Sequence, residues 1–229
     1  MPDKVVVLSG SGLSAESGLP TFRDAAGLWR QYSWMDLASP EGWRKQPRLV
    51  LEFYNERRAK AWTAEPNAAH RAIAGLERHF DVVVITQNVD NLHERAGSTQ
   101  VLHLHGELAF ARGTGPGRKR RRIDDAPIEL GQTCEEGTQL RPDIVWFGEE
   151  TQHMEEAREH VGSAGKVLVV GTSLSVYPAA SLVEYARPEA EKVLNSIEMD
   201  DVPAGFDFLP GRATEIVPRV TSRWSAGRS

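Results

Sequence analysis

The sequence predicts an α/β fold: a Rossmann-like, mostly parallel sheet with helices on both faces, and a smaller lobe formed by two insertions. The first observation is that short apolar, β-branched runs recur along the chain. Several of them are apolar at every position, as in strands buried on both faces. The second is that stretches with helical periodicity lie between these runs. Strands that alternate with helices favour an open, mostly parallel sheet.

Each expected strand is bounded by Gly, Asp, Asn or Pro. In chain order the strands are KVVVLS (4–9), DVVVIT (81–86), VLHL (101–104), DIVWF (143–147), KVLVVG (166–171) and KVLNSI (192–197). We expect helices over residues 47–62, over residues 68–80 and in the segment after Pro178, where the spacing suits a helical face.

Two segments do not fit this alternation. Residues 31–66 are helical in pattern but follow no strand–helix–strand step, and residues 110–142 are rich in Gly, Arg, Glu and Pro. We expect them to pack together as a small domain. Residues 1–30, 67–109 and 143–229 would then form the Rossmann-like domain.

Composition excludes several classes of protein. The 229 residues suffice for one large domain with a smaller insertion, and the net charge of −5 argues against attraction of nucleic acid to the whole surface. No apolar stretch is long enough for a membrane span, and the first residues lack a signal-peptide pattern. Cys134 is the only cysteine, which excludes an intramolecular disulfide and a multi-cysteine zinc site. We expect a monomeric protein of the cytoplasm.

The run RKRRR at residues 118–122 is a local exception to the acidic balance. It offers contacts to phosphates or acidic proteins. A solvated, mobile loop is the favoured interpretation, because no aromatic residues for base stacking are interleaved with the charges.

The stretch GSGLSAESGLPTFRD (10–24) follows the first strand, and its Gly10, Gly12 and Ala15 match the G-x-G-x-x-G/A pattern of dinucleotide-binding turns. A dehydrogenase would also need a long helix and an acidic residue that ends a second strand about 20 residues further on. Asp36 lies near that distance but ends no strand. The glycines still allow a backbone to approach a pyrophosphate closely. We expect a mobile loop after the turn, with Phe22 and Arg23 placed to close over a cofactor.

Six motifs occur in a fixed order: GSGLSAESGLPTFR, TQNVD (86–90), HG (105–106), FGE (147–149), GTSLSVYPAA (171–180) and Asn195 after an apolar run. Together they resemble the sirtuins, NAD-dependent protein-lysine deacylases, from residue 4 to about residue 217. The resemblance implies that the acyl-lysine oxygen attacks C1′ of the nicotinamide ribose. A general base then activates a ribose hydroxyl, and the products are free lysine, nicotinamide and O-acyl-ADP-ribose.

His105 matches the general base of the family, and the pKa of an imidazole suits that role. In VLHLHGE, His103 and His105 share one face of the expected strand, and Gly106 leaves room for a substrate. Two histidines at this spacing can also bind a metal, but no Cys, Asp or Glu cluster supports that interpretation. Without the other motifs, a structural histidine would be the better interpretation of His105.

Asn88 and Asp90 follow the strand DVVVIT, at the edge where open α/β sheets bind ligands. They offer the donor and acceptor that a nicotinamide carboxamide needs, and Gln87 can reach ribose hydroxyls. The alternative is a turn that caps the next helix. The resemblance favours binding and groups Asn88 and Asp90 with His105 as catalytic residues.

Further cofactor contacts follow from the resemblance. Around the opening turn they are Gly10, Ser11, Gly12, Ala15, Glu16, Thr21, Phe22, Arg23 and Trp29. Further along the chain they are Gly171, Thr172 and Ser173 for ribose and phosphate oxygens, Asn195, Ser196 and Ile197 for the adenosine ribose, and Ala213 near the adenine. For each of the later positions, an ordinary strand end with a Ser/Thr helix cap is the alternative.

The substrate peptide is expected between two edges, WFGEE and SLSVYP, as an added strand. The residues that the resemblance places there are Val145, Phe147, Gly148, Glu149 and Val176.

Tyr54 and Arg57, at i and i+3 on one helical face, form a receptor for a carboxylate. The pair resembles the Y-x-x-R of sirtuins that prefer succinyl- and malonyl-lysine, and Ala38 matches the small residue of their wide acyl pocket. The alternative is a core tyrosine beside an arginine that pairs with Glu56 or Glu65.

The chain departs from the family where four cysteines usually hold a structural zinc. Residues 106–142 contain Cys134 alone, and Gly113 stands about where a first ligand would fall. We therefore expect no zinc, and a lobe held by Ile123, Ile128, Leu130 and Leu140. Ser11 also replaces the usual alanine of the first motif.

Two other functions remain open on sequence grounds. One is mono-ADP-ribosyl transfer or NAD hydrolysis on the same scaffold. The other is a non-enzymatic NAD-binding scaffold docked through residues 118–122, which His105, Asn88 and Asp90 argue against because a scaffold needs no base.

Overall fold

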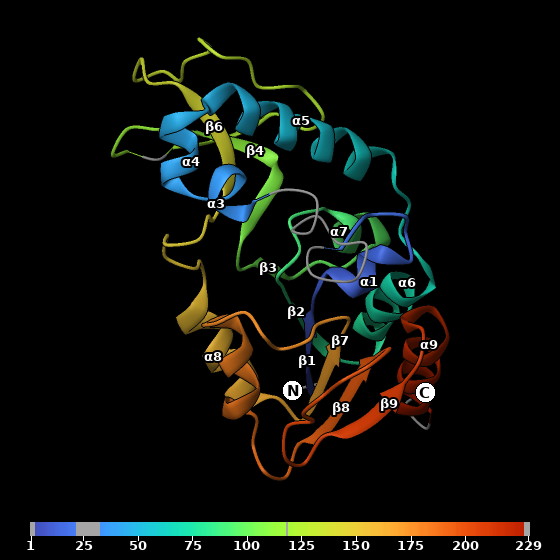
Figure 1. Ribbon diagram of the computed structural model, residues 1–229. Helices are drawn as coiled ribbons and strands as arrows, with labels where there is room; N and C mark the ends of the chain where they lie inside the picture. The colour runs from blue at the N-terminus through green and yellow to red at the C-terminus, as the bar shows by residue number, and fades with distance from the viewer. Residues whose placement is uncertain (1–2, 22–32, 118, 227–229) are drawn as a thin grey trace.

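The computed structural model describes residues 3–21, 33–117 and 119–226 (Figure 1). Its large sheet has six strands in the order β3-β2-β1-β7-β8-β9, and every neighbouring pair is parallel. This confirms the predicted Rossmann-like sheet. The strands are β1 (Lys4–Ser9), β2 (Asp81–Thr86), β3 (Val101–His103), β7 (Lys166–Val170), β8 (Glu191–Ser196) and β9 (Asp207–Pro210).

Helices cover both faces of this sheet, as predicted. Because side chains alternate along a strand, Val5 and Val7 of β1 face one layer and Val6 and Leu8 the other. The first layer consists of α6 (Ala68–Gly75), the 3-10 turn η1 (Leu76–Arg78) and α9 (Ala213–Ser225). The second consists of α8 (Met154–Ser163) and the 3-10 helix η2 (Ala179–Tyr185). The helix expected after Pro178 is therefore a 3-10 helix.

The opening turn leads into a short helix, α1 (Ser11–Ala15), and α7 (Leu92–Ala96) follows β2. Gly18 has φ +88° directly after α1, and Pro20 follows, so the chain turns away after barely more than one helical turn. Within the described residues, which break off after Thr21, a short helix and not a long one follows this turn.

A smaller lobe lies beyond the carboxyl ends of the large sheet (Figure 1). It contains an antiparallel sheet in the order β5-β4-β6, formed by β4 (Gly106–Gly113), β5 (Arg120–Arg122) and β6 (Leu140–Ile144). Its helices are α3 (Trp34–Leu37), α4 (Pro40–Lys45) and α5 (Pro47–Thr63).

The run DIVWF was expected in the parallel sheet, but its strand lies in the small sheet and begins at Leu140. Leu140 and Ile144 pack in the small lobe, while Arg141 and Asp143 on the same strand form buried ion pairs. The sequence did not indicate that these charged residues are buried in a sheet, because their partners Arg112 and Glu149 lie outside the strand and only folding brings them to it. The small sheet also takes in residues 106–109 and 143–144, beyond the predicted boundaries of the second insertion.

The prediction of a loop at residues 118–122 is wrong for Arg120–Arg122, which form β5, although these three residues are exposed to solvent as expected. These residues pair with β4, and Arg120 forms ion pairs with Glu107 and Asp143. The Arg120 guanidinium also lies 4.1 Å from the centre of the Phe110 ring. Residue 118 lies outside the described residues.

The core of the small lobe differs from the predicted one at Leu130, whose side chain is 47% exposed. Ile128 and Leu140 are buried as expected, Ile123 packs beside them, and α5 contributes Leu51. None of the described helices is long and apolar enough to cross a membrane.

Asn55 of α5 ties the irregular segment of this lobe to its helix. Its Oδ1 accepts from the backbone N–H of Ile128 and its Nδ2 donates to the Ile128 carbonyl, both at 2.9 Å. Arg58, which is 1% exposed, donates from Nε to the Leu108 carbonyl at 2.7 Å and from Nη1 to Asn55 Oδ1 at 2.7 Å.

Asn55→Ala is therefore expected to lower the free energy of unfolding by about 2–4 kcal/mol, because two backbone groups and one guanidinium N–H lose their partner. Urea denaturation measures the change. Glu52→Ala, on an exposed position of the same helix, is the control and should stay within about 0.5 kcal/mol of the parent. Equal stability of the two variants would contradict this anchoring role.

Candidate active site

A cavity of about 620 Å³ lies where the carboxyl ends of β1, β2, β7 and β8 meet the small lobe. Parallel strands end at one edge of a sheet, so the residues that follow them come together although they are far apart in the chain. These include Gly10 after β1, Gln87 after β2, Gly171 after β7, and Asn195 near the end of β8.

The turns after β1 and β7 interlock at the floor of the cavity. The Gly12 N–H donates to the Gly171 carbonyl at 2.8 Å, and the Gly10 N–H donates to the Val170 carbonyl at 3.0 Å. Gly171 has φ +64°, and a Cβ there would lie 2.2 Å from the Leu13 backbone nitrogen. The glycines thus serve first to let the two turns touch, and the backbone they form lines the cavity.

Glu16 links α1 to the start of α9. Its Oε1 accepts from the Ala213 N–H at 2.6 Å, and its Oε2 accepts from the Thr214 hydroxyl. A carboxylate at a helix N-terminus satisfies free N–H groups and suits the helix dipole. Glu16 and Ala213, both expected near the cofactor, also line the cavity.

Asn88 and Asp90 meet at Ser14, a residue that the sequence did not single out. Asn88 Nδ2 donates to Ser14 Oγ and to the Gly10 carbonyl, and Ser14 Oγ donates to Asp90 Oδ2, each at 3.0 Å. Burial raises the pKa of Asp90, against the hydrogen bonds from Leu92 N–H and Ser14. Ser14 lies in the motif GSGLSAES, four residues after Gly10. This position within the glycine-rich turn is the sequence feature that could have indicated Ser14 as a site residue.

His105 lies on the cavity wall, and within the described part of the chain Nδ1 makes the only hydrogen bond of its ring. Its Nδ1 is 3.1 Å from the Gln87 carbonyl, which can only accept, so Nδ1 carries the proton and Nε2 keeps its lone pair. Burial lowers the pKa of His105, and the hydrogen bond to Gln87 offsets this only in part. His105 is therefore neutral at pH 7 and can accept a proton at Nε2.

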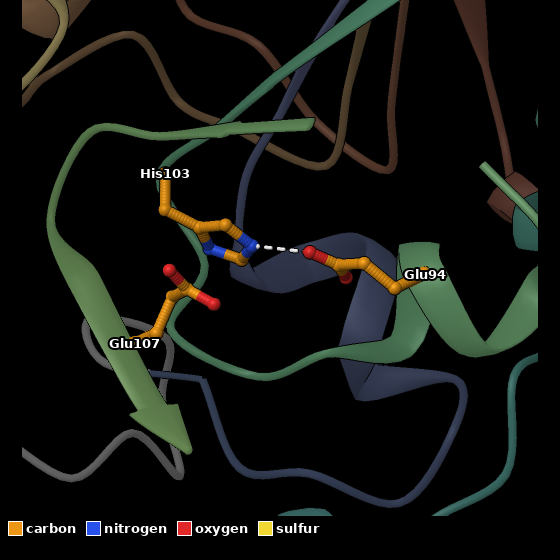
Figure 2. A group of neighbouring side chains, drawn as sticks. All are labelled: Glu94, His103 and Glu107. Carbon is orange, nitrogen blue, oxygen red and sulfur yellow. Dashed lines mark hydrogen bonds and ion pairs between the residues drawn. The ribbon is translucent and has the colours of Figure 1, made fainter. Parts of the chain in front are cut away.

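His103 lies in a different environment, which contradicts the expectation that no acidic cluster accompanies it. Figure 2 shows its ring between Glu94 of α7 and Glu107 of β4. Nitrogen and carboxylate oxygens of the three residues lie within 4.8 Å of one another, and His103 Nε2 is 2.8 Å from Glu94 Oε1. The two acidic residues come from segments on either side of the HLHG run, so the spacing of the histidines alone does not reveal them.

At the other end of the cavity, Asn195 is 1% exposed. Its Nδ2 donates to the carbonyls of Leu209 at 2.8 Å and Gly211 at 3.1 Å. Its Oδ1 is buried, and within the described part of the chain it has no hydrogen-bond partner. A ligand hydroxyl fits this unpaired acceptor. Nearby, Gln87 Nε2 donates to Thr172 Oγ1 at 3.0 Å.

The opposite wall comes from the small lobe. Tyr54 is 4% exposed, and burial raises its pKa to about 12, so its hydroxyl stays protonated. Ala38 is 5% exposed, and its carbonyl accepts from the Phe147 N–H at 2.9 Å. This bond joins α3 to the FGE segment.

Behind that wall, Glu149 accepts from Arg141 Nη1 at 2.7 Å and from Arg112 Nη2 at 3.2 Å. The Arg141 guanidinium also lies 3.2 Å from the centre of the Trp146 ring. Sequence reasoning missed Arg112 and Arg141, since they are separated in the chain and only the pairing of β4 with β6 brings them together.

The structure brings most of the predicted site residues to this cavity: Gly10, Ser11, Gly12, Glu16, Ala38, Tyr54, Gln87, Asn88, His105, Val145, Phe147, Gly148, Glu149, Gly171, Thr172, Ser173, Val176, Asn195, Ser196, Ile197 and Ala213. Ala15 and Thr21 are not among the lining residues, although Thr21 is buried. Phe22, Arg23 and Trp29 lie outside the described residues. Ile144, Thr151 and Glu198 line the cavity without having been predicted.

Asp90 and Arg57 line a second cavity of about 90 Å³. The two cavities share Ser11, Asn88 and Val89 in their walls, so they adjoin. Tyr54 therefore faces the large cavity and Arg57 the small one next to it.

Residues 10–178 match the model of the Sir2 family. An NAD-dependent protein deacylase of Helicobacter pylori strain J99 is 52% identical over 187 residues, 81% of this chain and 79% of that protein. One of Shewanella oneidensis is 41% identical over 237 residues, covering 100% of this chain and 97% of its own length. A solved Sir2 homologue, a point mutant in complex with ADP ribose, superposes with a TM-score of 0.89 at 38% identity, covering 96% of this chain and 91% of that one.

Proposed function

We propose that this chain, which belongs to the Sir2 family and is an NAD-dependent protein deacylase, prefers acyl groups that carry a negative charge. These are the succinyl and malonyl groups on lysine. The observation that carries the proposal is the wall formed by Ala38 and Tyr54, with Arg57 one helical turn further along α5.

A carboxylate needs donors of fixed direction. The protonated Tyr54 hydroxyl is one, and the Arg57 guanidinium offers a planar fork. Tyr54 and Arg57 influence each other's pKa, which reflects their proximity. Ala38 contributes only a methyl group, which leaves room for a longer acyl chain.

The residues of the large cavity fit NAD. The buried Asn195 Oδ1, which has no hydrogen-bond partner among the described residues, suits a ribose hydroxyl. The glycine turns offer backbone to a pyrophosphate. When bound, NAD supplies an electrophilic ribose carbon and a leaving nicotinamide. We propose that Asn88, Asp90 and Ser14 hold the nicotinamide side, and that His105 removes a ribose hydroxyl proton at Nε2.

The substrate edges are Val145 to Glu149 on one side and Val176 on the other. The Glu149–Arg141–Arg112 cluster holds the first edge rigid, and Glu149 Oε2 accepts from the Trp146 N–H at 2.9 Å. We propose that an acylated lysine enters between these edges, with its peptide backbone along them.

We further propose that the small lobe holds no zinc. A Cβ on Gly113 would lie 2.7 Å from Cys134 Sγ, so the two positions do adjoin, but glycine has no ligand atom. The thiol instead lies 3.2 Å from the Thr138 hydroxyl. One thiolate and a hydroxyl do not fit a tetrahedral structural site, and the lobe is held by its apolar core and Asn55 instead.

Arg57→Met is expected to lower kcat/KM for a succinyl-lysine peptide about 10- to 100-fold, since one charge-assisted contact is worth about 1.5–3 kcal/mol. Turnover of the matching acetyl-lysine peptide should change less than about threefold. Mass spectrometry of the peptides with NAD gives both rates and also detects ADP-ribosylated products, which would support the transferase alternative instead.

Arg48→Met, on an exposed position of α5, is the matched control and should keep both rates. An equal loss of succinyl and acetyl turnover in Arg57→Met would refute the carboxylate receptor while leaving the deacylase itself intact.

A further inference from the structure

Both ring nitrogens of His103 face groups that can only accept hydrogen bonds. Nδ1 is 3.0 Å from the Asn88 carbonyl. Nε2 is 2.8 Å from the Glu94 carboxylate, the contact drawn in Figure 2. A neutral imidazole has a single N–H and satisfies one of them. The ring is 5% exposed, so water does not readily replace the missing donor. Two hydrogen bonds thus require a doubly protonated imidazolium.

The charges around His103 favour that form. Glu94 on α7 and Glu107 on β4 face it, and Asp90 also acts on it, while Arg120 and Arg122 of β5 act on Glu107 and Glu94. His93, next to Glu94, is neutral because burial lowers its pKa well below the usual value. Burial alone would lower the pKa of His103, but the hydrogen bond and charge of Glu94, with Glu107 and the Asn88 carbonyl, raise it.

A divalent metal is a poorer occupant of this cluster. Glu107 is already ion-paired with Arg120, and Glu94 is bonded to the His103 ring, so a metal would have to break both contacts. A proton on His103 preserves both of them.

The two histidines of HLHG form hydrogen bonds with the backbone carbonyls of two successive residues. His105 Nδ1 bonds to Gln87, and His103 Nδ1 bonds to Asn88. The Asn88 backbone lies between these carbonyls. Its position sets the direction of the His105 ring and the place of the Asn88 side chain, which reaches Gly10 and Ser14.

We propose that His103 is a positioning residue: as an imidazolium held between Glu94 and Glu107, it fixes the Gln87–Asn88 backbone that orients the base His105 and the Asn88 amide. For its kinetic consequences this inference rests on the proposed function of the cavity. When His103 loses a proton, the Glu94 carboxylate competes for the remaining N–H, and Nδ1 is left as a lone pair facing the Asn88 carbonyl. His103 then no longer donates to the Asn88 carbonyl, and the turn after β2 loses this hydrogen bond.

The pH dependence follows from the sign of the shift. Since folding raises the pKa of His103, its contribution to stability is fully present below the unfolded value of about 6.5 and is lost as the pH rises through the folded pKa. Activity should fall on the same alkaline side. His105 acts on the opposite limb, because its pKa is lowered and it must be neutral.

The first test needs no turnover. Long-range ¹⁵N–¹H spectra of the NAD-free protein at pH 7 report the protonation of each histidine ring, and His103→Asn assigns the signal. We expect both nitrogens of His103 to be protonated and His105 to be a neutral Nδ1–H tautomer. A neutral His103 at this pH overturns the proposal, whatever the enzyme's substrates are.

The second test uses pH profiles of kcat/KM for NAD with a succinyl-lysine peptide. An asparagine amide at position 103 can donate to the Asn88 carbonyl at any pH, so His103→Asn should keep activity within about threefold at pH 7 and lose the alkaline decline. Glu94→Gln should also lose it, because a Gln amide can donate to Nε2 while Nδ1 keeps its proton. His103→Ala should lose about tenfold in kcat/KM at all pH values.

His153→Asn, at an exposed histidine, is the control and should keep the parent profile. An alkaline decline that persists unchanged in both His103→Asn and Glu94→Gln overturns the proposal. If the parent protein turns over no acyl-lysine at all, the proposed function fails, and the NMR result still decides the state of His103.

Discussion

His105→Asn is expected to reduce kcat for acyl-lysine peptides by about 10²- to 10⁴-fold, the usual contribution of a general base. An Asn amide occupies the place of Nδ1 and can still donate to the Gln87 carbonyl, so the turn after β2 keeps its partner. It has nothing in the place of Nε2, the ring nitrogen that carries the lone pair when Nδ1 is protonated.

Because the substitution removes only the base, NAD should still bind with an affinity close to that of the parent. Isothermal titration with NAD and steady-state kinetics measure the two quantities separately. His79→Asn, at a histidine remote from the cavity lining, is the control and should leave both unchanged. Retention of more than a tenth of the parent kcat in His105→Asn would assign the base to another residue.

Gly171→Ala is expected to have the largest effect on the architecture of the site. Gly171 has φ +64°, and the added Cβ would lie 2.2 Å from Leu13 N, which belongs to the backbone and cannot rotate away. The strained backbone and the displaced turn should together lower the free energy of unfolding by about 2–5 kcal/mol. NAD binding should weaken by more than tenfold, since the turns after β1 and β7 then separate.

Gly162→Ala is the matched control, because its Cβ in α8 would come no closer than 3.8 Å to the Tyr185 carbonyl. Alanine in a helix is favoured over glycine, so this variant should be as stable as the parent or about 0.5–1 kcal/mol more stable. Urea denaturation and NAD titration compare the two. Normal NAD binding by Gly171→Ala would show that the interlocked turns do not form the cofactor floor.

The sequence predicted the large sheet well because its strands are buried on both faces. Runs such as VVVL in β1 and VLVV in β7 have no solvent side, so hydrophobic burial alone identifies them. The short α1 was predictable for a local reason as well, since Gly18 and Pro20 end a helix in any context.

Where the prediction was wrong, the decisive partner was distant in the chain. Arg120 is expected in a loop, but its pairing with β4 places it beside Glu107 and Asp143. Leu130 was predicted to lie in the core of the small lobe because it is apolar. In the structure Leu130 is exposed, and Leu51 of α5 is buried in that core. A run of charged residues in the sequence does not indicate which acidic or basic residue elsewhere in the chain will form an ion pair with it.

The sequence by itself determined the α/β class through its hydrophobic periodicity. Its six ordered motifs, through their resemblance to the sirtuins, indicated the residues that gather at the sheet's carboxyl edge. Only the tertiary structure decided that His103 meets Glu94 and Glu107 while His105 meets a carbonyl alone. Two identical side chains two residues apart thereby take different charges, since protonation depends on the groups that folding brings within hydrogen-bonding distance.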